Sequence, residues 1–207
     1  MSSAKFWDKT AEKYAKHPMP NESVYEQKLE MTQRYLNSNS VVLEIACGTG
    51  TTALRHAPVV KHIDAWDISQ NMLAIAKEKQ KAQALENIAF HCADVTSCTL
   101  AIERYDMVMA HSILHLIGNR KDVLQKLNKA LKPGGVFVSS TACLGNKMKW
   151  LALIAKPLSK LGFWPDVFFF TSKDLEVEIE KAGFKIEESW LPDKAIAHFF
   201  IARKIVE

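Results

Sequence analysis

A short turn with two glycines, Cys47-Gly48-Thr49-Gly50, is the first part of the sequence that could bind a ligand. It joins a mostly apolar run at 41–46 to a helical pattern that begins at Thr51. The chain has only eight glycines, so two in one short turn indicate a backbone that passes close to a ligand. The first N–H groups of the following helix are free to bind a carboxylate or a pyrophosphate. The turn therefore predicts a small-molecule site at the end of the first strand.

An acidic residue, Asp67, follows the next apolar run, about where a ribose-binding acid stands in dinucleotide-binding proteins. The letters at 48–53 also satisfy the pattern G-x-G-x-x-G/A, so a nicotinamide dinucleotide stays open as the ligand. Asp64 belongs to the same run, and we expect it to be a solvated residue of the strand.

Apolar runs and helical patterns alternate along most of the chain. The runs that predict strands are 41–46, 59–66, 87–92, 105–110 and 135–141. The patterns that predict helices are 5–16, 22–37, 51–57, 69–82 with Ser69 as N-cap, 119–132 and 172–182. Alternation of this kind predicts a parallel sheet with helices on both faces.

Two further strand patterns, 184–191 and 194–204, follow the last helix. The link between them, Pro192-Asp193, is too short for a crossover helix, so these strands must pair antiparallel. We therefore predict an α/β, Rossmann-like fold with a seven-stranded, mainly parallel sheet and a reversed C-terminal strand. A nicotinamide-dependent dehydrogenase needs no such strand. We expect one domain over 1–207, with an N-terminal helical lid at 1–37.

The composition favours a globular protein of the cytoplasm. Apolar residues make up 48% and charged residues 24% of the chain, which argues against disorder. Lys and Arg exceed Asp and Glu by 27 to 23, too small and scattered an excess to predict nucleic-acid binding. The four cysteines form no CxxC pair, so we expect reduced thiols. We find neither the apolar core of a signal peptide nor an apolar run long enough to span a membrane.

Five motifs, in order along the chain, resemble those of the class I S-adenosylmethionine-dependent methyltransferases. They are V-L-E-I-A-C-G-T-G at 42–50, W-D-I-S-Q-N-M-L at 66–73, A-D-V at 93–95, Y-D-M-V-M-A-H at 105–111 and L-K-P-G-G-V at 131–136. The resemblance extends over about 5–204, and it is only general toward the methyltransferases of quinone biosynthesis. Ala46 stands where many members have a glycine, and we expect its methyl group to be tolerated and to tighten the pocket slightly.

The resemblance implies S-adenosylmethionine as the cofactor and assigns residues to its parts. The methionine end would lie over the turn residues Ala46, Cys47, Gly48 and Gly50, and Asp67 would bind the ribose. Ile68 and Met72 would pack on the adenine, and Asp94 and Val95 would bind its polar edge. His111 would lie beside the cofactor. Glu44 would lie below the turn and favour a cationic ligand, as the sulfonium and ammonium groups require. Tyr14 is similar to a tyrosine that closes over the cofactor carboxylate, and simple packing in an amphipathic helix is the alternative.

Two histidines, His111 and His115, follow the fourth predicted strand, where an acceptor would bind. Their spacing would place them on one face of a helix, as a general base or as neutral residues lining the pocket. No third ligand accompanies them, so we predict no metal site. The chain also lacks the Asn/Asp-Pro-Pro-Tyr/Phe run and the Pro-Cys pair of two groups of nucleic-acid methylases, which argues against a nucleic-acid substrate.

The stretch 144–170 exceeds what the alternating pattern needs. It contains six aromatic residues, Trp150, Phe163, Trp164, Phe168, Phe169 and Phe170, and one acid, Asp166. We predict an apolar cap, which could shield the sheet edge, close over an apolar acceptor, or contact a membrane peripherally through 147–161. The predicted function is therefore methyl transfer to a small, partly apolar molecule. A non-catalytic cofactor-binding protein of the same fold and a nicotinamide-dependent oxidoreductase are the alternatives.

Overall fold

The computed structural model describes residues 3–17, 21–146, 164–193 and 195–206, and the single residues Met148, Leu151 and Ser159. Its strands are β1 (Val41–Ile45), β2 (His62–Asp67), β3 (Ile88–Cys92), β4 (Tyr105–His111), β5 (Leu131–Ala142), β6 (Phe184–Trp190) and β7 (Ala197–Lys204). Its helices are α1 (Ser3–Lys16), α2 (Glu22–Gln33), α3 (Thr51–His56), α4 (Gln70–Ala82), α5 (Arg120–Ala130) and α7 (Ser172–Lys181), with the short 3-10 helices η1 (Ala57–Val59) and η2 (Leu114–Leu116).

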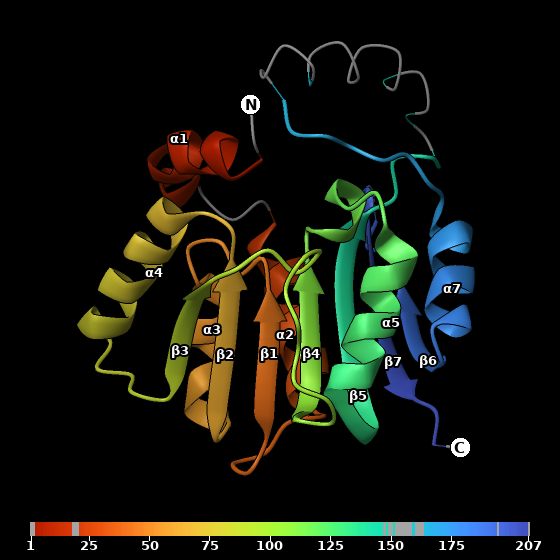
Figure 1. Ribbon diagram of the computed structural model, residues 1–207, viewed down its shortest axis with the longest axis horizontal. Coiled ribbons are helices and arrows are strands. Elements are labelled where there is room, and N and C mark those ends of the chain that lie inside the picture. The colour runs from red at the N-terminus through yellow and green to blue at the C-terminus, as the bar shows by residue number, and fades with distance from the viewer. Residues whose placement is uncertain are drawn as a thin grey trace.

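The strands form one sheet in the order β3-β2-β1-β4-β5-β7-β6. Strands β1 to β5 pair in parallel, whereas β7 lies antiparallel between β5 and β6. In Figure 1 the arrowheads of β1, β2 and β4 point toward α1, and β7 runs the other way. The predicted seven-stranded, mainly parallel Rossmann-like sheet with a reversed C-terminal strand is confirmed.

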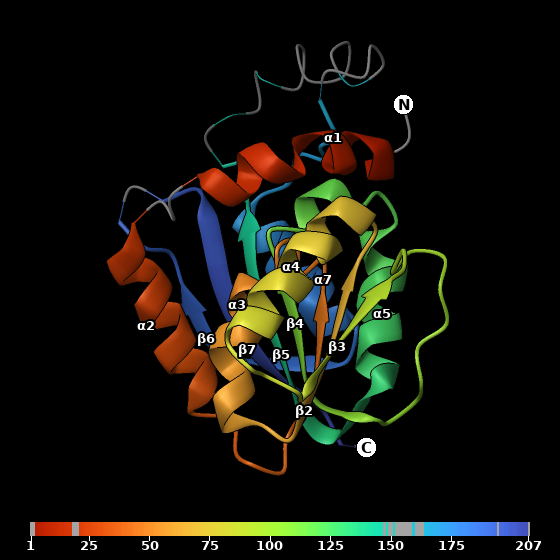
Figure 2. The ribbon, with the colours of Figure 1, turned by 90° about the vertical axis from the view of Figure 1, so that its left-hand side faces the viewer.

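Side chains of the strands alternate between the two faces of the sheet and fill a core on each. On β1, Leu43 and Ile45 belong to the core shared with α5 and α7, whereas Val42 belongs to the core under α2, α3 and α4. Figure 2 shows α2 and α5 on opposite sides of the sheet, with α1 across the strand ends. Because the central strands are covered on both faces, their sequences are apolar runs rather than alternating patterns.

Strand β5 begins at Leu131 rather than at 135, and β7 begins at Ala197 rather than at 194. Two further elements, α2 and β2, also depart from their predicted bounds by three or four residues. Helix α2 ends at Gln33 rather than at 37, because Asn37 and Ser40 form a polar turn in which the Asn37 N–H donates to Ser40 Oγ at 3.0 Å. Strand β2 begins at His62 rather than at 59, because Pro58 occupies the first turn of the 3-10 helix η1. The errors at α2 and β2 both lie at positions where a turn former follows or interrupts a regular pattern.

The predicted apolar cap at 144–170 lies largely outside the described residues, as does nearly all of the predicted membrane-contact helix at 147–161. Of the cap's aromatic residues, the structure describes Trp164, Phe168, Phe169 and Phe170. The backbone N–H of Phe168 donates to the carbonyl of His115 at 2.8 Å, so this segment passes beside the loop after β4. None of the described helices is long and apolar enough to cross a membrane.

Candidate active site

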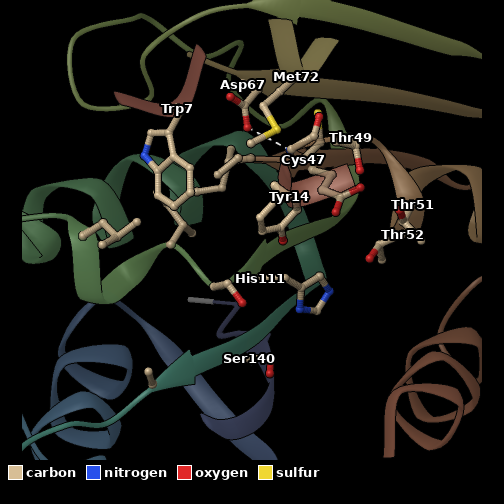
Figure 3. Close-up of a pocket in the computed structure, with 18 of the residues that line it drawn as sticks. Trp7, Tyr14, Cys47, Thr49, Thr51, Thr52, Asp67, Met72, His111 and Ser140 are labelled. Atoms are coloured by element: carbon tan, nitrogen blue, oxygen red, sulfur yellow. Dashed lines mark hydrogen bonds between the residues drawn. The ribbon is translucent and has the colours of Figure 1, made fainter. Parts of the chain in front are cut away.

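A cleft of about 1660 Å³ lies along the carboxyl ends of β1, β2, β4 and β5, beneath α1. This is the edge of a parallel α/β sheet at which ligands bind. A single small-molecule site usually occupies roughly 300–1,000 Å³. The cleft therefore has room for two small molecules side by side. Figure 3 shows the side chains that project into it from the turn after β1, from α1 and from the ends of β4 and β5.

The turn after β1 forms the floor of the cleft. Three of its residues have left-handed backbone conformations: Ala46 with φ 52°, Gly48 with φ 55° and Gly50 with φ 74°. The Gly50 N–H donates to the Cys47 carbonyl at 2.9 Å, which closes the turn. A methyl group added at Gly48 would meet the Tyr14 ring only at 3.9 Å. The backbone at Gly48 is thus open to a ligand.

Ala46→Gly is expected to stabilise the protein by about 0.5–1 kcal/mol. The sequence prediction took the Ala46 methyl group to be tolerated, but its positive φ strains an L-residue by about 1–2 kcal/mol. The larger flexibility of glycine in the unfolded chain offsets part of this gain. Urea unfolding of the two proteins measures the difference. A lower free energy of unfolding for the variant would show that packing of the methyl group outweighs the strain.

Asp67, the last residue of β2, both supports the turn and borders the cleft (Figure 3). Its Oδ2 accepts a hydrogen bond from the Gly48 N–H at 2.8 Å, and its Oδ1 accepts one from the Ser69 N–H at 2.9 Å. Burial raises the pKa of Asp67, and these two hydrogen bonds oppose the rise. Each carboxylate oxygen has a second acceptor position. Asp67 can therefore hold the turn and still accept hydrogen bonds from hydroxyl groups of a ligand.

Glu44 lies on β1 under the turn and is only 2% exposed. Burial, together with the negative charge of Asp67, raises the pKa of Glu44 to about 8, although a hydrogen bond from the Ala53 backbone opposes the rise. Among the described residues, Glu44 Oε2 has no hydrogen-bond partner. A buried carboxyl oxygen without a partner is costly, and a cationic group in the cleft would supply one. The buried carboxyl oxygen of Glu44 therefore suits a ligand that carries a sulfonium or an ammonium group.

Helix α1 lies over the cleft and is fixed to the start of α4 by Asp8. Asp8 Oδ1 accepts hydrogen bonds from the Ser69 hydroxyl at 2.7 Å and from the Asn71 N–H at 3.2 Å. These contacts hold the Tyr14 ring beside Gly48, where a tyrosine that closes over the cofactor would lie. Of the described residues of the predicted lid at 1–37, those of α1 lie over the cleft, whereas α2 packs on the sheet and borders the cleft with residues such as Lys28. The movement of this lid stays a prediction.

The residues predicted to bind the adenine border one part of the cleft. They are Ile68, Met72, Asp94 and Val95. Asp94 Oδ1 accepts hydrogen bonds from the N–H and the hydroxyl of Thr96, at 2.8 Å and 2.7 Å, which orient its carboxylate. Gly50, which was also predicted to contact the cofactor, does not line the cleft. A methyl group added at Gly50 would lie 2.9 Å from Ala76 Cβ and 3.1 Å from the Phe90 ring. Gly50 thus allows α4 to pack close to the turn.

His111 and His115 do not share a helical face, contrary to the prediction from their spacing. His111 is the last residue of β4, Ser112 has a left-handed backbone with φ 53°, and His115 lies in η2. Both imidazoles border the cleft. Burial, with smaller effects of His56 and Lys28, lowers the pKa of His111 to about 3, and burial lowers that of His115 to about 4. Both side chains are therefore neutral at neutral pH.

Asp64, expected to be solvated, is buried. Its carboxylate accepts a hydrogen bond from the Tyr105 hydroxyl at 2.9 Å and pairs with Arg104 at 2.8 Å and with His62 and His91 at 3.2 Å. These partners come from β2, β3 and the start of β4, so Asp64 joins neighbouring strands rather than a ligand. The expectation failed because His91, Arg104 and Tyr105 lie far from Asp64 in sequence and only the folded sheet brings them to its carboxylate, whereas His62 is two residues away.

Lys28, His56 and Ser140 are among the polar residues that border the cleft and were not singled out from the sequence. Lys28 Nζ donates to Ser140 Oγ at 2.8 Å, and Ser140 stands opposite His111 in the register of β4 and β5. The position of Ser140 at the carboxyl end of a predicted strand could have marked it, whereas nothing in the helical patterns distinguishes Lys28 or His56. Among the residues that the structure describes, no three His, Cys, Asp or Glu side chains are grouped to hold a metal ion.

A family profile described as "Methyltransferase domain" matches residues 36–183. This range contains the turn after β1, Asp67 and the ends of β4 and β5, which form most of the cleft. The chain belongs to the S-adenosylmethionine-dependent methyltransferases. The resemblance of the chain to this family is thereby confirmed.

The names of curated relatives describe different acceptors. Malonyl-[acyl-carrier protein] O-methyltransferase of Bacillus cereus is 32% identical over 114 residues, which are 54% of this chain and 41% of the relative. Demethylmenaquinone methyltransferase of Leptospira interrogans is 33% identical over 102 residues, 47% of this chain and 41% of the relative. The tRNA 5-carboxymethoxyuridine methyltransferase of Escherichia coli is 31% identical over 98 residues, 46% of this chain and 38% of the relative. The match thus spans about two fifths of the length of each of these relatives.

Solved structures show how widely this fold is used. The [4+2]-cyclase SpnF has a TM-score of 0.74 to this chain at 16% sequence identity, covering 90% of this chain and 83% of the cyclase. A shared fold does not fix the reaction. The acceptor must therefore be argued from the residues of the cleft.

Proposed function

We propose that this methyltransferase binds S-adenosylmethionine along the cleft and transfers its methyl group to a small, partly apolar acceptor. The observation that carries the proposal is the buried Glu44 Oε2, which has no hydrogen-bond partner among the described residues and lies beneath the turn. A cofactor with sulfonium and ammonium groups supplies that partner, whereas the Asp67 carboxylate, and Glu44 where it is ionised, would repel a pyrophosphate. The same argument favours this cofactor over a nicotinamide dinucleotide.

The residues of the chain would act mainly by positioning. When bound, the cofactor supplies an electrophilic methyl carbon: an electron pair of the acceptor forms the new bond as the carbon–sulfur bond breaks and its electrons return to sulfur. The turn at Gly48 would hold the methionine end, and Asp67 the ribose hydroxyls. Alignment of acceptor, carbon and sulfur can supply much of the rate.

The space left for the acceptor lies toward β4 and β5. Apolar side chains border it, among them Ile113, Leu116 and Trp164. This lining supports a partly apolar small molecule, and the weak net charge of the chain, +4, argues against a polyanion such as tRNA.

Methyl transfer is tested by incubating the protein with methyl-labelled S-adenosylmethionine and fractionated cell extract, followed by mass spectrometry of the labelled products. We expect the label in a small, partly apolar compound. Cofactor binding without any labelled product would favour the non-catalytic alternative. Label in RNA alone would overturn the proposed acceptor.

Asp67→Ala is expected to weaken binding of both S-adenosylhomocysteine and 5′-methylthioadenosine by about tenfold or more, because both ligands carry the ribose. Calorimetric titration measures the two affinities. Glu44→Gln is the matched control, since it should weaken only the ligand that carries the ammonium group. Unchanged affinity of Asp67→Ala for methylthioadenosine would exclude the ribose assignment.

His111 and His115 are expected to stay neutral from pH 9 down to about pH 5, because burial lowers both pKa values, to about 3 and 4. Carbon-13 NMR of the imidazoles across this range measures their titration. A midpoint near pH 7 for either ring would instead favour a general base. With neutral rings, His111→Ala and His115→Ala should retain turnover between pH 6 and 9 once an acceptor is known.

A further inference from the structure

The charged groups that border the cleft come from several elements. Glu44 and Asp67 lie at the ends of β1 and β2, and Lys79 Nζ donates to Thr49 Oγ1 in the turn after β1 at 3.0 Å. Lys28 reaches the cleft from α2, and the imidazoles of His56 and His111, both neutral at neutral pH, border it as well. In the proposed function Glu44 and Asp67 face the cationic cofactor, so the part of the cleft beside Lys28 and Ser140 is left for the acceptor.

Lys28 is a charged residue beside this part of the cleft, and Asp193 borders the cleft as well. Lys28 reaches the cleft from α2, is half-buried, and donates from Nζ to the neutral hydroxyl of Ser140 at 2.8 Å. Among the described residues it forms no ion pair. An ammonium group has three N–H donors. A single neutral hydrogen-bond partner therefore leaves most of its hydrogen-bonding capacity unused, and among the described residues no carboxylate balances its charge.

The surroundings of Lys28 make this mismatch significant. Its Nζ lies 6.0 Å from the centroid of the Phe199 ring, and burial lowers its pKa. Removing a cation from water without a counter-charge is costly unless a ligand supplies one.

His56 gives an independent sign of a missing polar partner. It is 0% exposed and borders the cleft, yet neither ring nitrogen has a hydrogen-bond partner in the described part of the chain. Burial lowers its pKa to about 4, so its ring is neutral and carries one N–H donor. His56 and Lys28 both act electrostatically on His111, which places the three groups in one neighbourhood.

We propose that Lys28, Ser140 and His56 form a subsite that binds a carboxylate group of the acceptor. Lys28 supplies the counter-charge, the Ser140 hydroxyl that it orients supplies a second donor, and the His56 ring, fully buried in the free protein, supplies a further one. Charge-assisted hydrogen bonds of this kind are about twice as strong as neutral ones. The acceptor is then a small organic acid whose carboxylate lies toward β5 and whose apolar part lies against Ile113 and Leu116. This inference rests on the proposed function, which assigns the part of the cleft beside Glu44 and Asp67 to the cofactor.

The test compares two probes of nearly equal shape, 3-phenylpropanoate and its amide, by ligand-observed NMR with the protein free and saturated with S-adenosylhomocysteine. The wild-type protein is expected to bind the acid at least about tenfold more tightly than the amide. Lys28→Met, which keeps the unbranched side chain and removes the charge, is expected to abolish this preference. Lys28→Arg is expected to retain most of it.

Separate titration of each variant with S-adenosylhomocysteine distinguishes the two proposals. Unchanged affinity in Lys28→Met, together with loss of the acid preference, supports the subsite. Equal binding of acid and amide by the wild-type protein, no binding of either, or a preference that survives in Lys28→Met overturns it. Weakened cofactor binding in Lys28→Met would also overturn it, by placing Lys28 in the cofactor site. A wild-type protein that binds neither S-adenosylmethionine nor S-adenosylhomocysteine contradicts the proposed function instead.

Discussion

Glu44→Gln is expected to weaken the binding of S-adenosylmethionine by about 10- to 100-fold at pH 8. The substitution keeps the size of the side chain and removes the negative charge that would face the cationic end of the cofactor. It leaves the hydrogen bonds of Asp67 to Gly48 and Ser69 untouched. Calorimetric titration measures the change, and methylthioadenosine, which lacks the ammonium group, should bind both proteins equally. Equal binding of the full cofactor to both proteins would exclude Glu44 as its partner.

The same carboxyl group predicts that cofactor binding releases a proton. Burial raises the pKa of Glu44 to about 8, so at pH 7 most of the free protein carries a neutral Glu44. A bound cation favours the ionised form and lowers this pKa again. The apparent binding enthalpy at pH 7 should therefore differ between phosphate and Tris buffers for the wild-type protein, and not for Glu44→Gln. Equal wild-type enthalpies in the two buffers would contradict the elevated pKa.

The raised pKa of Glu44 also predicts that Glu44→Gln, although it weakens cofactor binding, gains stability relative to the wild-type protein as the pH rises. Between pH 4.5 and about 8 the unfolded chain has released the Glu44 proton and the folded protein still holds it. The folded state therefore binds more protons, and its stability falls as the pH rises through this range. Gln cannot ionise, so Glu44→Gln should gain stability over the wild-type protein at pH 8 compared with pH 5. Urea unfolding at the two pH values measures this difference.

Gly50→Ala is expected to destabilise the protein by about 2–4 kcal/mol, the second large effect. Part of the cost is strain, because φ at Gly50 is 74°. The rest is overpacking, because the added methyl group would lie 2.9 Å from Ala76 Cβ and would push α4 from the turn. Thermal or urea unfolding measures the loss.

Gly134→Ala is the matched control for this substitution. Gly134 lies in the turn within the first residues of β5 and has φ 71°, yet a methyl group added there would meet no atom within 4 Å. The control should therefore lose only the strain, about 1 kcal/mol. Equal losses for the two variants would show that contact with Ala76 is unimportant and that backbone conformation alone requires glycine at both positions.

Sequence periodicity could predict the sheet because the central strands are covered on both faces and end in recognisable turns. The reversed strand was predictable for a simpler reason, since Pro192-Asp193 leaves no room for a crossover. Of the residues proposed to bind the cofactor, those next to the turn or at strand ends were also predictable, because a parallel sheet brings these positions together.

Contacts between residues distant in sequence could not be predicted in this way. Asp64 looked like a surface acid, but strands β3 and β4 bring His91 and Tyr105 to its carboxylate. The spacing of His111 and His115 suggested a helix, whereas the left-handed Ser112 ends β4 with a sharp turn. No sequence pattern marked Lys28 as a residue of the cleft, since only the packing of α2 on the sheet brings it to Ser140.

The central claim is that the cleft binds S-adenosylmethionine through the acidic groups at the ends of β1 and β2. Parallel calorimetric titrations of the wild-type protein with S-adenosylmethionine and with reduced nicotinamide dinucleotide test it most directly. The structure predicts one saturable site for S-adenosylmethionine and no binding of the dinucleotide. Saturable binding of the dinucleotide, with none of S-adenosylmethionine, would contradict the account.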